Sequence, residues 1–284
     1  MPPLVTEDAA WRLLLAVPRD ERATSRTVPD DHNASGAVRL HITPEGAWGT
    51  SAPPSDAARD LLDLYLPLQL DPGLVIGQIG QSLDGRIATE QGHSHYITGP
   101  ADIRRLHRLR ALVDAVVVGA GTVAADDPRL TVREVEGDNP VRVVLDPSGR
   151  LGTDRAVFRD GAARTVVVRR APAGRTAERP ARDTLELSAD PASADGSLAP
   201  AAIVAALREQ GLSRILVEGG GVTVSRFLEA GVLTRLHVTV APLVIGSGRH
   251  ALDLPPVPSL DRALRPPCRR FPLGDDVLFD LDLR

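Results

Sequence analysis

Lysine is absent from this sequence of 284 residues, so all 33 basic side chains are arginines. A Walker A phosphate loop requires Gly-Lys-[Ser/Thr] and is therefore excluded. A Schiff-base lysine for pyridoxal phosphate or aldolase chemistry is excluded too, as is the strand lysine of protein kinases. Because arginine stays charged, every cationic contact that this chain makes with a ligand uses a fixed positive charge.

Cysteine is nearly absent as well, with Cys268 as the single example. One cysteine excludes an intramolecular disulfide, a cysteine-rich zinc site and a CxxC redox pair. It also excludes the zinc site of nucleobase deaminases, which needs a Pro-Cys-x-x-Cys pair. His93 and His95 could suggest a metal, but the sequence offers no further ligand near them, and we predict no metal site.

Neither strong charge nor long apolar runs are present. The net charge is −4, which gives no general electrostatic case for binding nucleic acid or an anionic membrane. The apolar runs fall far short of the ~20 residues of a membrane span. The first residues are acidic and lack the basic start of a secretory signal. We therefore expect a cytoplasmic protein without nucleic-acid or membrane partners.

The first 72 residues read as an extension or small subdomain. An apolar helical pattern starts at Trp11 and stops at Pro18, and the polar residues 19–36 are expected to form a loop. Alternating residues at 38–42, followed by a turn and residues 47–49, predict a short hairpin. Ser55 is a candidate cap for a helix that runs to about Leu66 and is ended by Pro67.

Residues 73–284 alternate between strand and helix patterns, which predicts an α/β domain. The runs 115–118 and 215–217 are continuous and β-branched or aliphatic, as buried parallel strands are. Expected strands cover 75–81, 114–119, 142–146, 165–169, 184–187, 214–218, 235–241 and 277–283. Expected helices cover 101–112, 199–210 and 222–230.

A glycine-rich segment, Gly119-Ala-Gly121-Thr122-Val-Ala124, follows one of these strands directly. It matches the G-x-G-x-x-[G/A] pattern that lets a backbone approach a pyrophosphate. A standard Rossmann unit needs a crossover of ten or more residues, whereas Asp126-Asp127-Pro128 interrupts this one after a turn. We interpret the segment as a phosphate or cofactor cradle outside a standard Rossmann fold, with a plain tight turn as the alternative.

A second glycine run, Glu218-Gly219-Gly220-Gly221, also lies between a strand and a helix. Successive glycines at a helix start expose backbone N–H groups to an anion. Ligands of open α/β sheets bind beyond the carboxyl ends of the strands, where Glu218 is expected. The alternative is a structural glycine turn with a surface glutamate.

Three other features carry little signal by themselves. The segment Ser82-Leu-Asp84-Gly85-Arg86 reads as a turn between two strands. Arg110 and Arg133 could bind phosphate bidentately, but a single arginine is more often a solvated surface residue. His107 is expected to be exposed or locally paired.

Taken together, these segments resemble the reductase domain of RibD, the bifunctional riboflavin-biosynthesis deaminase/reductase. The matching motifs are Ser82-Leu-Asp-Gly-Arg-Ile-Ala, Ser94-His-Tyr96-Ile-Thr, Leu109-Arg110-Ala, Val118-Gly-Ala-Gly-Thr122, Asp126-Asp-Pro-Arg-Leu130-Thr-Val-Arg133, Pro140–Asp146 and Leu216-Val-Glu218-Gly-Gly. They cover about residues 74–250. The deaminase half and its zinc ligands have no counterpart, and residues 1–72 match nothing in the family.

The resemblance implies a dihydrofolate-reductase-like fold, a mixed and mostly parallel sheet flanked by helices, assembled as a homodimer. It implies NADPH-dependent reduction of a ribosylamino-pyrimidine 5′-phosphate to its ribitylamino product. Substrate-contacting positions carried over by the motifs are Ser94, Arg110, Leu130, Arg133 and Glu218. Cofactor-contacting positions are Gly80, Tyr96, Thr122, Asp126, Gly220, Gly221, Val222 and Thr223, beside Gly119 and Gly121 of the cradle. Tyr96 stands where the family often has Trp.

The implied chemistry is ring opening to an imine and hydride transfer to the sugar C1 carbon. Within the motifs, only the carboxyl groups of Asp126 and Glu218 could relay the proton that the imine nitrogen needs. Two alternatives stay open. The same fold and NADPH could serve a pterin-like or specialised-metabolism imine or carbonyl, or the chain could be a non-catalytic nucleotide-binding protein. Turnover of NADPH with the candidate pyrimidine separates the leading hypothesis from both alternatives.

Overall fold

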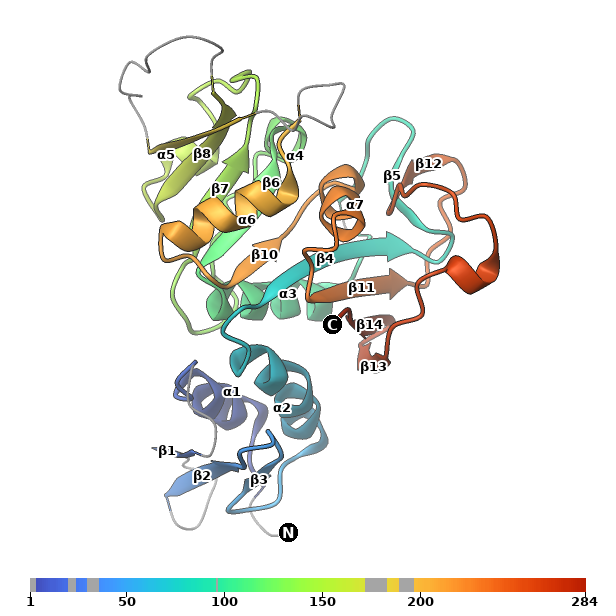
Figure 1. The fold of residues 1–284 in the computed structure, drawn as a ribbon. Helices are drawn as coiled ribbons and strands as arrows, with labels where there is room; N and C mark the ends of the chain where they lie inside the picture. Colours follow the sequence, from blue (N-terminus) through green and yellow to red (C-terminus); the bar gives the residue numbers. More distant parts are fainter. Residues whose placement is uncertain (1–3, 20–23, 30–35, 96, 172–182, 189–196) are drawn as a thin grey trace. The chain divides into compact units, whose positions relative to one another are not determined.

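The computed structural model describes residues 4–19, 24–29, 36–95, 97–171, 183–188 and 197–284. The chain divides into two compact units, residues 1–73 and 74–284. Figure 1 shows both units as a ribbon, and each is described here by itself.

The first unit packs two helices on each other beside a small antiparallel sheet. Thr6 and Ser55 accept backbone N–H groups at the starts of the helices, as N-caps do. Trp11 and Tyr65 meet edge to face between the helices, with ring centroids 5.8 Å apart. The elements are α1 (Glu7–Leu15), β1 (Ser25–Pro29), β2 (Ala37–Ile42), β3 (Trp48–Thr50) and α2 (Asp56–Gln69), with sheet order β1-β2-β3.

The predicted hairpin is confirmed as β2 and β3, but two other expectations for this unit are wrong. The expected loop 19–36 contains β1, which pairs antiparallel with β2. Its sequence has a single large apolar residue, Val28, so no alternation revealed it. The second helix continues past Pro67 and ends at Gln69. Pro67 lies in the last turn of the helix, and buried side chains of that turn, such as Leu68, hold the turn in place.

The second unit is built on a sheet of nine strands in the order β13-β14-β11-β4-β10-β6-β7-β8-β9. All neighbours from β11 to β9 pair in parallel, whereas β14 and β13 add antiparallel strands at one edge. The strands of this sheet are β4 (Val75–Ser82), β6 (Ala115–Gly119), β7 (Val141–Leu145), β8 (Thr165–Arg170), β9 (Thr184–Leu187), β10 (Ile215–Val217), β11 (Arg235–Ala241), β13 (Cys268–Leu273) and β14 (Asp276–Asp282). Two further strands, β5 (Arg86–Thr89) and β12 (Gly248–His250), pair antiparallel in a small sheet of their own.

Helices cover both faces of this sheet. In Figure 1, α6 and α7 lie across one face and α3 lies behind the other. Ile203 and Phe227 of α6 and α7 share a buried cluster with Val117 and Val217 of the central strands. The helices are α3 (Pro100–Leu112), α4 (Ala120–Asp126), α5 (Ala156–Arg159), α6 (Pro200–Glu209) and α7 (Gly221–Glu229), with the 3-10 turn η1 (Leu260–Arg262).

The expected fold class, a mixed and mostly parallel sheet flanked by helices, is confirmed. The sequence did not reveal β12 or β13, which lie at edges; β13 carries Pro272, which only an edge strand tolerates. The expected surface loops 171–183 and 189–198 fall almost entirely outside the described residues. Within the described chain, no helix has the length and apolar character needed to cross a membrane.

Candidate active site

A large cavity of about 1080 Å³ opens beyond the carboxyl ends of the central strands of the second unit. Its wall is formed by the residues that end β4, β6, β7 and β10, together with parts of α3, β5 and β12. Open α/β sheets bind ligands at this edge because the strands are parallel and their connecting turns meet there. The volume lies at the upper end of the range for pockets that bind small molecules.

The two glycine turns meet at the middle of this wall. β6 and β10 are parallel neighbours, so Gly119 and Glu218 leave the sheet side by side. The hydroxyl of Thr122 accepts the Gly220 N–H at 3.1 Å and ties the turns together. Gly219 has φ +112, and a Cβ on Gly221 would lie 2.4 Å from the Ala251 carbonyl oxygen, so neither position admits a side chain. No side chain caps α7, which begins in this turn.

Arg110 and Glu218 form a bidentate ion pair in the wall beside these turns. Arg110 Nε donates to Glu218 Oε1 at 2.8 Å, and its Nη2 donates to Oε2 at 2.7 Å. The two side chains are 8% and 7% exposed, and Nη1 donates to the Thr131 carbonyl at 3.1 Å. Since three of its N–H groups are engaged, Arg110 serves mainly to fix Glu218 and the loop at Thr131.

The loop that follows α4 is held from several sides. Asp127 and Leu130 adopt positive φ values of 41° and 55°, which is strained for residues other than glycine. His107 is buried, contrary to expectation, and its Nδ1 accepts the Arg133 N–H at 2.9 Å. Burial, and then the charges of Arg110 and Arg133, lower the pKa of His107 to about 4. His107 is thus a neutral acceptor between two arginines.

Asp102 lies at the bottom of the cavity, where α3 passes under β4. A Cβ on Gly80 would lie 2.9 Å from Thr98 Cγ2 and 3.6 Å from Asp102 Oδ2, so glycine leaves the room that Thr98 occupies beside this carboxylate. Asp102 Oδ1 accepts Arg105 Nε at 2.6 Å and the Thr239 hydroxyl at 2.7 Å. Burial would raise the pKa of Asp102, but Arg105 and Thr239 outweigh it and lower the pKa below its usual value.

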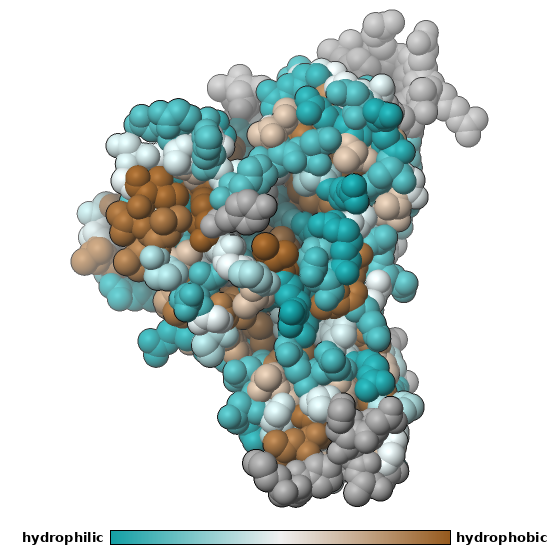
Figure 2. Space-filling model, turned by 180° about the vertical axis from the view of Figure 1, so that it is seen from behind, coloured by the Kyte–Doolittle hydropathy of each residue, from teal (hydrophilic) through white to brown (hydrophobic). Residues whose placement is uncertain are grey.

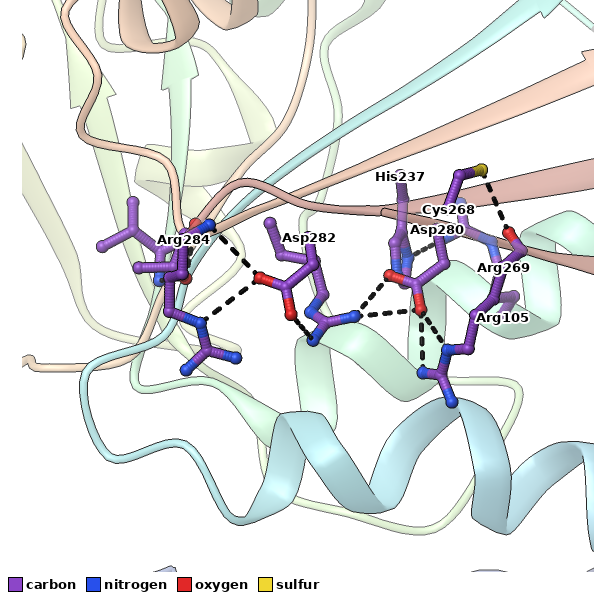
Figure 3. A network of polar contacts seen from close by, with 10 residues as sticks. Arg105, His237, Cys268, Arg269, Asp280, Asp282 and Arg284 are labelled. Carbon is purple, nitrogen blue, oxygen red and sulfur yellow. Dashed lines mark hydrogen bonds and ion pairs between the residues drawn. The ribbon is translucent and has the colours of Figure 1, made fainter. Parts of the chain in front are cut away.

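From Asp102 a chain of buried polar groups runs across β11 to the sheet edge. Arg105 Nη1 lies 3.0 Å from His237 Nδ1, and His237 Nε2 lies 3.2 Å from Asp280 Oδ1 in a poorly aligned contact. Figure 3 shows Asp280 between His237 and Arg269. Arg235 Nη1 also donates to both Asp280 oxygens, at 2.9 and 3.0 Å. The network fixes α3, and hence the cavity floor, against the antiparallel edge.

The charges of this network determine one another. Burial would raise the pKa of Asp280, but His237 and Arg235 hold it well below its usual range. Burial lowers the pKa of His237 to about 4 in spite of the contact with Asp280. The network therefore contains a neutral imidazole between an arginine and an aspartate.

The turn after β4 is fastened at the rim of the cavity. Asp84 accepts the Ser82 hydroxyl at 2.6 Å and the N–H groups of Ile245 and Gly246 at 3.1 and 2.7 Å. These bonds, that from Ser82 first, lower the pKa of Asp84 to about 2. The segment that reads as a simple turn therefore also anchors the 243–246 loop beside β5.

Most residues singled out from the sequence come together in this cavity. Leu130 is buried and Arg133 is exposed, and neither lines the cavity, while Tyr96 lies outside the described residues. Lining the cavity are Gly80, Ser94, Arg110, Gly119, Gly121, Thr122, Asp126, Glu218, Gly220, Gly221, Val222 and Thr223.

Sequence reasoning missed Asp102, Arg150 and Arg249 of the cavity wall, and it missed the burial of His107. The three wall residues stand outside the motifs that drew attention. Only the i, i+3 spacing of His107 and Arg110, which puts both on one face of a helix, could have linked His107 to the site. Among the described residues, no group of three or more His, Cys, Asp or Glu side chains is placed to hold a metal.

The fold and the cavity define an α/β protein whose candidate ligand site is lined by two glycine turns and a buried arginine–glutamate pair. The chain is 36% identical over 218 residues to the 2,5-diamino-6-ribosylamino-4(3H)-pyrimidinone 5′-phosphate reductase of Methanothermobacter thermautotrophicus, which covers 74% of this chain and 98% of that protein. It is 33% identical over 193 residues to riboflavin biosynthesis protein RibD of Mycobacterium tuberculosis, covering 65% of this chain and 46% of that one.

Solved structures agree. The deaminase/5-amino-6-(5-phosphoribosylamino)uracil reductase of Thermotoga maritima superposes with TM-score 0.60 at 26% identity, over 79% of this chain and 59% of that longer chain. The yeast riboflavin biosynthesis reductase Rib7 shares the fold with TM-score 0.63 at 20% identity, over 80% of this chain and 99% of that one. Residues 74–267 match the model of the RibD C-terminal domain. The chain belongs to that family and is an oxidoreductase.

Proposed function

We propose that this chain reduces a ribosylamino-pyrimidine 5′-phosphate to its ribitylamino product with NADPH. The observation that carries the proposal is the joint presence, on one cavity, of the interlocked glycine turns and the Arg110–Glu218 pair. The names of the relatives from Methanothermobacter thermautotrophicus and Archaeoglobus fulgidus support a pyrimidinone phosphate as the substrate class.

The glycine turns suit the pyrophosphate of a dinucleotide. Gly219 to Gly221 have no side chains between the backbone and the cavity, and the uncapped start of α7 offers N–H groups there. When bound, NADPH would supply a hydride. Gly80, Thr122 and Asp126 lie on the same wall and are proposed to contact it, together with Val222 and Thr223.

Glu218 is proposed to orient the substrate. Arg110 occupies one lone pair on each carboxylate oxygen, which leaves the others to accept hydrogen bonds from ribose hydroxyl or amino groups. Asp126 is exposed at the end of α4 and reaches the cavity, so it is the better placed carboxylate to deliver a proton, directly or through water. Ser94 is proposed as a further substrate contact.

Arg133 is proposed to bind the substrate phosphate. Its guanidinium is exposed, its Nη1 is held by the Thr131 hydroxyl at 2.7 Å, and Arg110 and Arg129 add positive charge around it. The strained backbone at Leu130 sets the direction in which the segment Thr131–Arg133 leaves the loop. Arg133→Ala should therefore raise KM for the phosphorylated substrate and leave that for a dephosphorylated analogue unchanged.

One experiment tests the proposal directly. The full chain is mixed with NADPH and with either the deaminated or the still-aminated ribosylaminopyrimidine phosphate, and the loss of NADPH absorbance is followed. We expect turnover on one of the two, and a Glu218→Gln variant should slow it. Absence of turnover on both substrates contradicts the proposal.

The two alternatives give other results in the same assay. A reductase for a pterin-like or specialised-metabolism imine would oxidise NADPH only with that other substrate. A non-catalytic nucleotide-binding protein would bind NADPH without turnover. The filled positions Thr122, Asp126, Arg133 and Glu218 favour an active enzyme over the second alternative.

We further propose that the chain forms a homodimer. Exposed apolar side chains gather at one edge of the surface in Figure 2, and the segment 243–264 contributes several of them. These are Leu243, Val244, Leu254, Val257, Leu260 and Leu264. A patch of this kind on a protein surface is typical of a contact with another chain. Analytical ultracentrifugation of the wild type and a Leu260→Asp, Leu264→Asp variant tests it, with dissociation expected for the variant.

A further inference from the structure

The cavity continues past the glycine turns to an apolar end. This end lies next to β7, the neighbour of β6 on the side away from β4. Its lining side chains are Leu145, Pro147, Leu198, Pro200 and Ile203. An apolar end beside a pyrophosphate cradle has the character that an adenine ring needs, with the reacting half of the dinucleotide then directed toward Gly80 and Glu218.

The carboxylate at the end of β7 is not available to a ligand. Asp146 is buried, and its two oxygens accept the N–H groups of Arg150 and Leu151, both at 3.0 Å. In nucleotide-binding α/β folds, an acidic residue near the adenosine favours NAD by bonding the ribose 2′-hydroxyl, and an arginine there accommodates the 2′-phosphate of NADP. Here the acidic group is turned into the loop.

Arg150 follows in the same turn, and its guanidinium is free. It is exposed, it lines the cavity, and its Nη2 would lie 3.9 Å from a Cβ on Gly121 of the first glycine turn. Among the described residues, its guanidinium has no hydrogen-bond or ion-pair partner, and only its backbone N–H is bonded, to Asp146. A solvated guanidinium beside a phosphate cradle matches a phosphate bidentately.

We propose that Arg150 binds the 2′-phosphate of NADPH and thereby makes this chain select NADPH over NADH. The proposal rests on the proposed function in one respect, that a nicotinamide dinucleotide is the cofactor. It deepens that function by assigning the discrimination between the two dinucleotides to one residue outside the motifs.

Arg249 provides a matched control within the same cavity. It also lines the wall, but it belongs to β12 and lies beside Gly92, where a Cβ would be 3.6 Å from its Nη2. Its removal takes the same charge from the cavity without touching the turn after β7. Arg270 on the edge strand β13 is exposed and does not line the cavity, so Arg270→Ala controls for the loss of any surface arginine.

The test is calorimetric titration of the full chain with adenosine 2′,5′-bisphosphate and with adenosine 5′-monophosphate, in the absence of substrate. We expect Arg150→Ala to weaken binding of the bisphosphate by about 10-fold to 100-fold, the worth of a charge-assisted contact, and to leave the monophosphate unchanged. Arg150→Lys should retain part of the preference. Arg249→Ala and Arg270→Ala should keep it in full.

Two results would overturn the proposal. One is an equal loss for both nucleotides in Arg150→Ala, and the other is a loss of bisphosphate binding in Arg249→Ala as large as that in Arg150→Ala. Because the titration contains no pyrimidine and needs no turnover, it is separate from the test of the reaction. If the wild-type chain oxidises NADPH and Arg150→Ala binds the bisphosphate as tightly as the wild type, only the assignment of the 2′-phosphate to Arg150 is refuted.

Discussion

Arg110, Arg133 and Arg150 carry the same fixed charge, yet their surroundings give them different tasks. Arg110 is buried and donates hydrogen bonds to Glu218 and to the Thr131 carbonyl, so the carboxylate of Glu218 compensates its charge within the protein. Arg133, which does not line the cavity, and Arg150, which does, are both exposed and keep donors for a ligand. In a chain without lysine, burial rather than residue type therefore separates structural cations from those that bind phosphate.

His107 offers a test at the scale of one residue. Replacing it by leucine removes the acceptor of the Arg133 N–H, so the loop that carries Arg133 loses a bond worth about 1–3 kcal/mol. We expect KM for the phosphorylated substrate to rise roughly 10-fold, with KM for NADPH unchanged. Steady-state kinetics with each substrate varied in turn measures the split.

The matched variant is His107→Asn, whose side-chain oxygen takes a position close to that of Nδ1. It should restore most of the affinity for the phosphorylated substrate. Equal KM values in the leucine variant and the wild type would mean that Arg133 does not depend on His107. A parallel rise of both KM values would point to a general loss of structure instead.

At the scale of elements, the ionic network predicts which strand contacts matter. Asp280→Ala on β14 leaves Arg235, Arg269 and His237 without their shared acceptor. It should lower the free energy of unfolding by about 3–5 kcal/mol. Asp282→Ala, on the same strand, removes an anion whose side chain is 35% exposed, and should cost less than about 1 kcal/mol. Denaturant unfolding of both variants gives the difference, and similar losses would contradict a special role for the buried network.

The elements that the sequence predicted well are those whose pattern comes from burial on one or both faces. The central strands β6 and β10 are buried throughout, and their continuous aliphatic runs indicated this. β1 and β13 are exposed over most of their length, so their pairing comes from neighbours in space rather than from their own pattern. Composition therefore does not reveal β1 and β13, whereas the edge strand β9 was predicted with its observed bounds, 184–187.

The candidate site divides in the same way. The glycine turns and Glu218 could be found because backbone approach and strand ends leave a local signature in the sequence. Arg150, Asp102 and His107 could not, because their places in the site depend on residues far away in the sequence. His107 bonds the N–H of Arg133, 26 residues away, Asp102 bonds Thr239, 137 residues away, and the Arg150 guanidinium lies beside Gly121. Likewise, the buried pairing of Arg110 with Glu218 joins positions 108 residues apart.

For the whole molecule, two buried histidines predict how stability depends on pH. The pKa values of His107 and His237 are lowered from 6.5 to about 4 in the folded chain. Between about pH 4 and pH 6.5 the unfolded chain binds more protons at these histidines than the folded chain does. The free energy of unfolding therefore has its full value above about pH 6.5 and decreases as the pH falls toward 4, by up to about 1.4 kcal/mol per pH unit for each histidine. Denaturant unfolding at several pH values measures the slope, and His107→Asn should reduce it by about half. A flat profile down to pH 5 would contradict the assignment.

The division of the chain predicts that residues 74–284 suffice for catalysis. Every residue that lines the cavity lies between Gln78 and Asp253, and the strands of that unit pair only among themselves. The Methanothermobacter relative aligns over 98% of its own length with 74% of this chain. A variant that lacks residues 1–73 should therefore fold, and its KM for NADPH and for the pyrimidine should stay within a factor of about two of those of the full chain. Circular dichroism confirms folding and steady-state assays give the constants. A folded variant with a much higher KM would show that the first unit contributes to the site. Equal constants would mean that the first unit has a role other than binding NADPH or the pyrimidine.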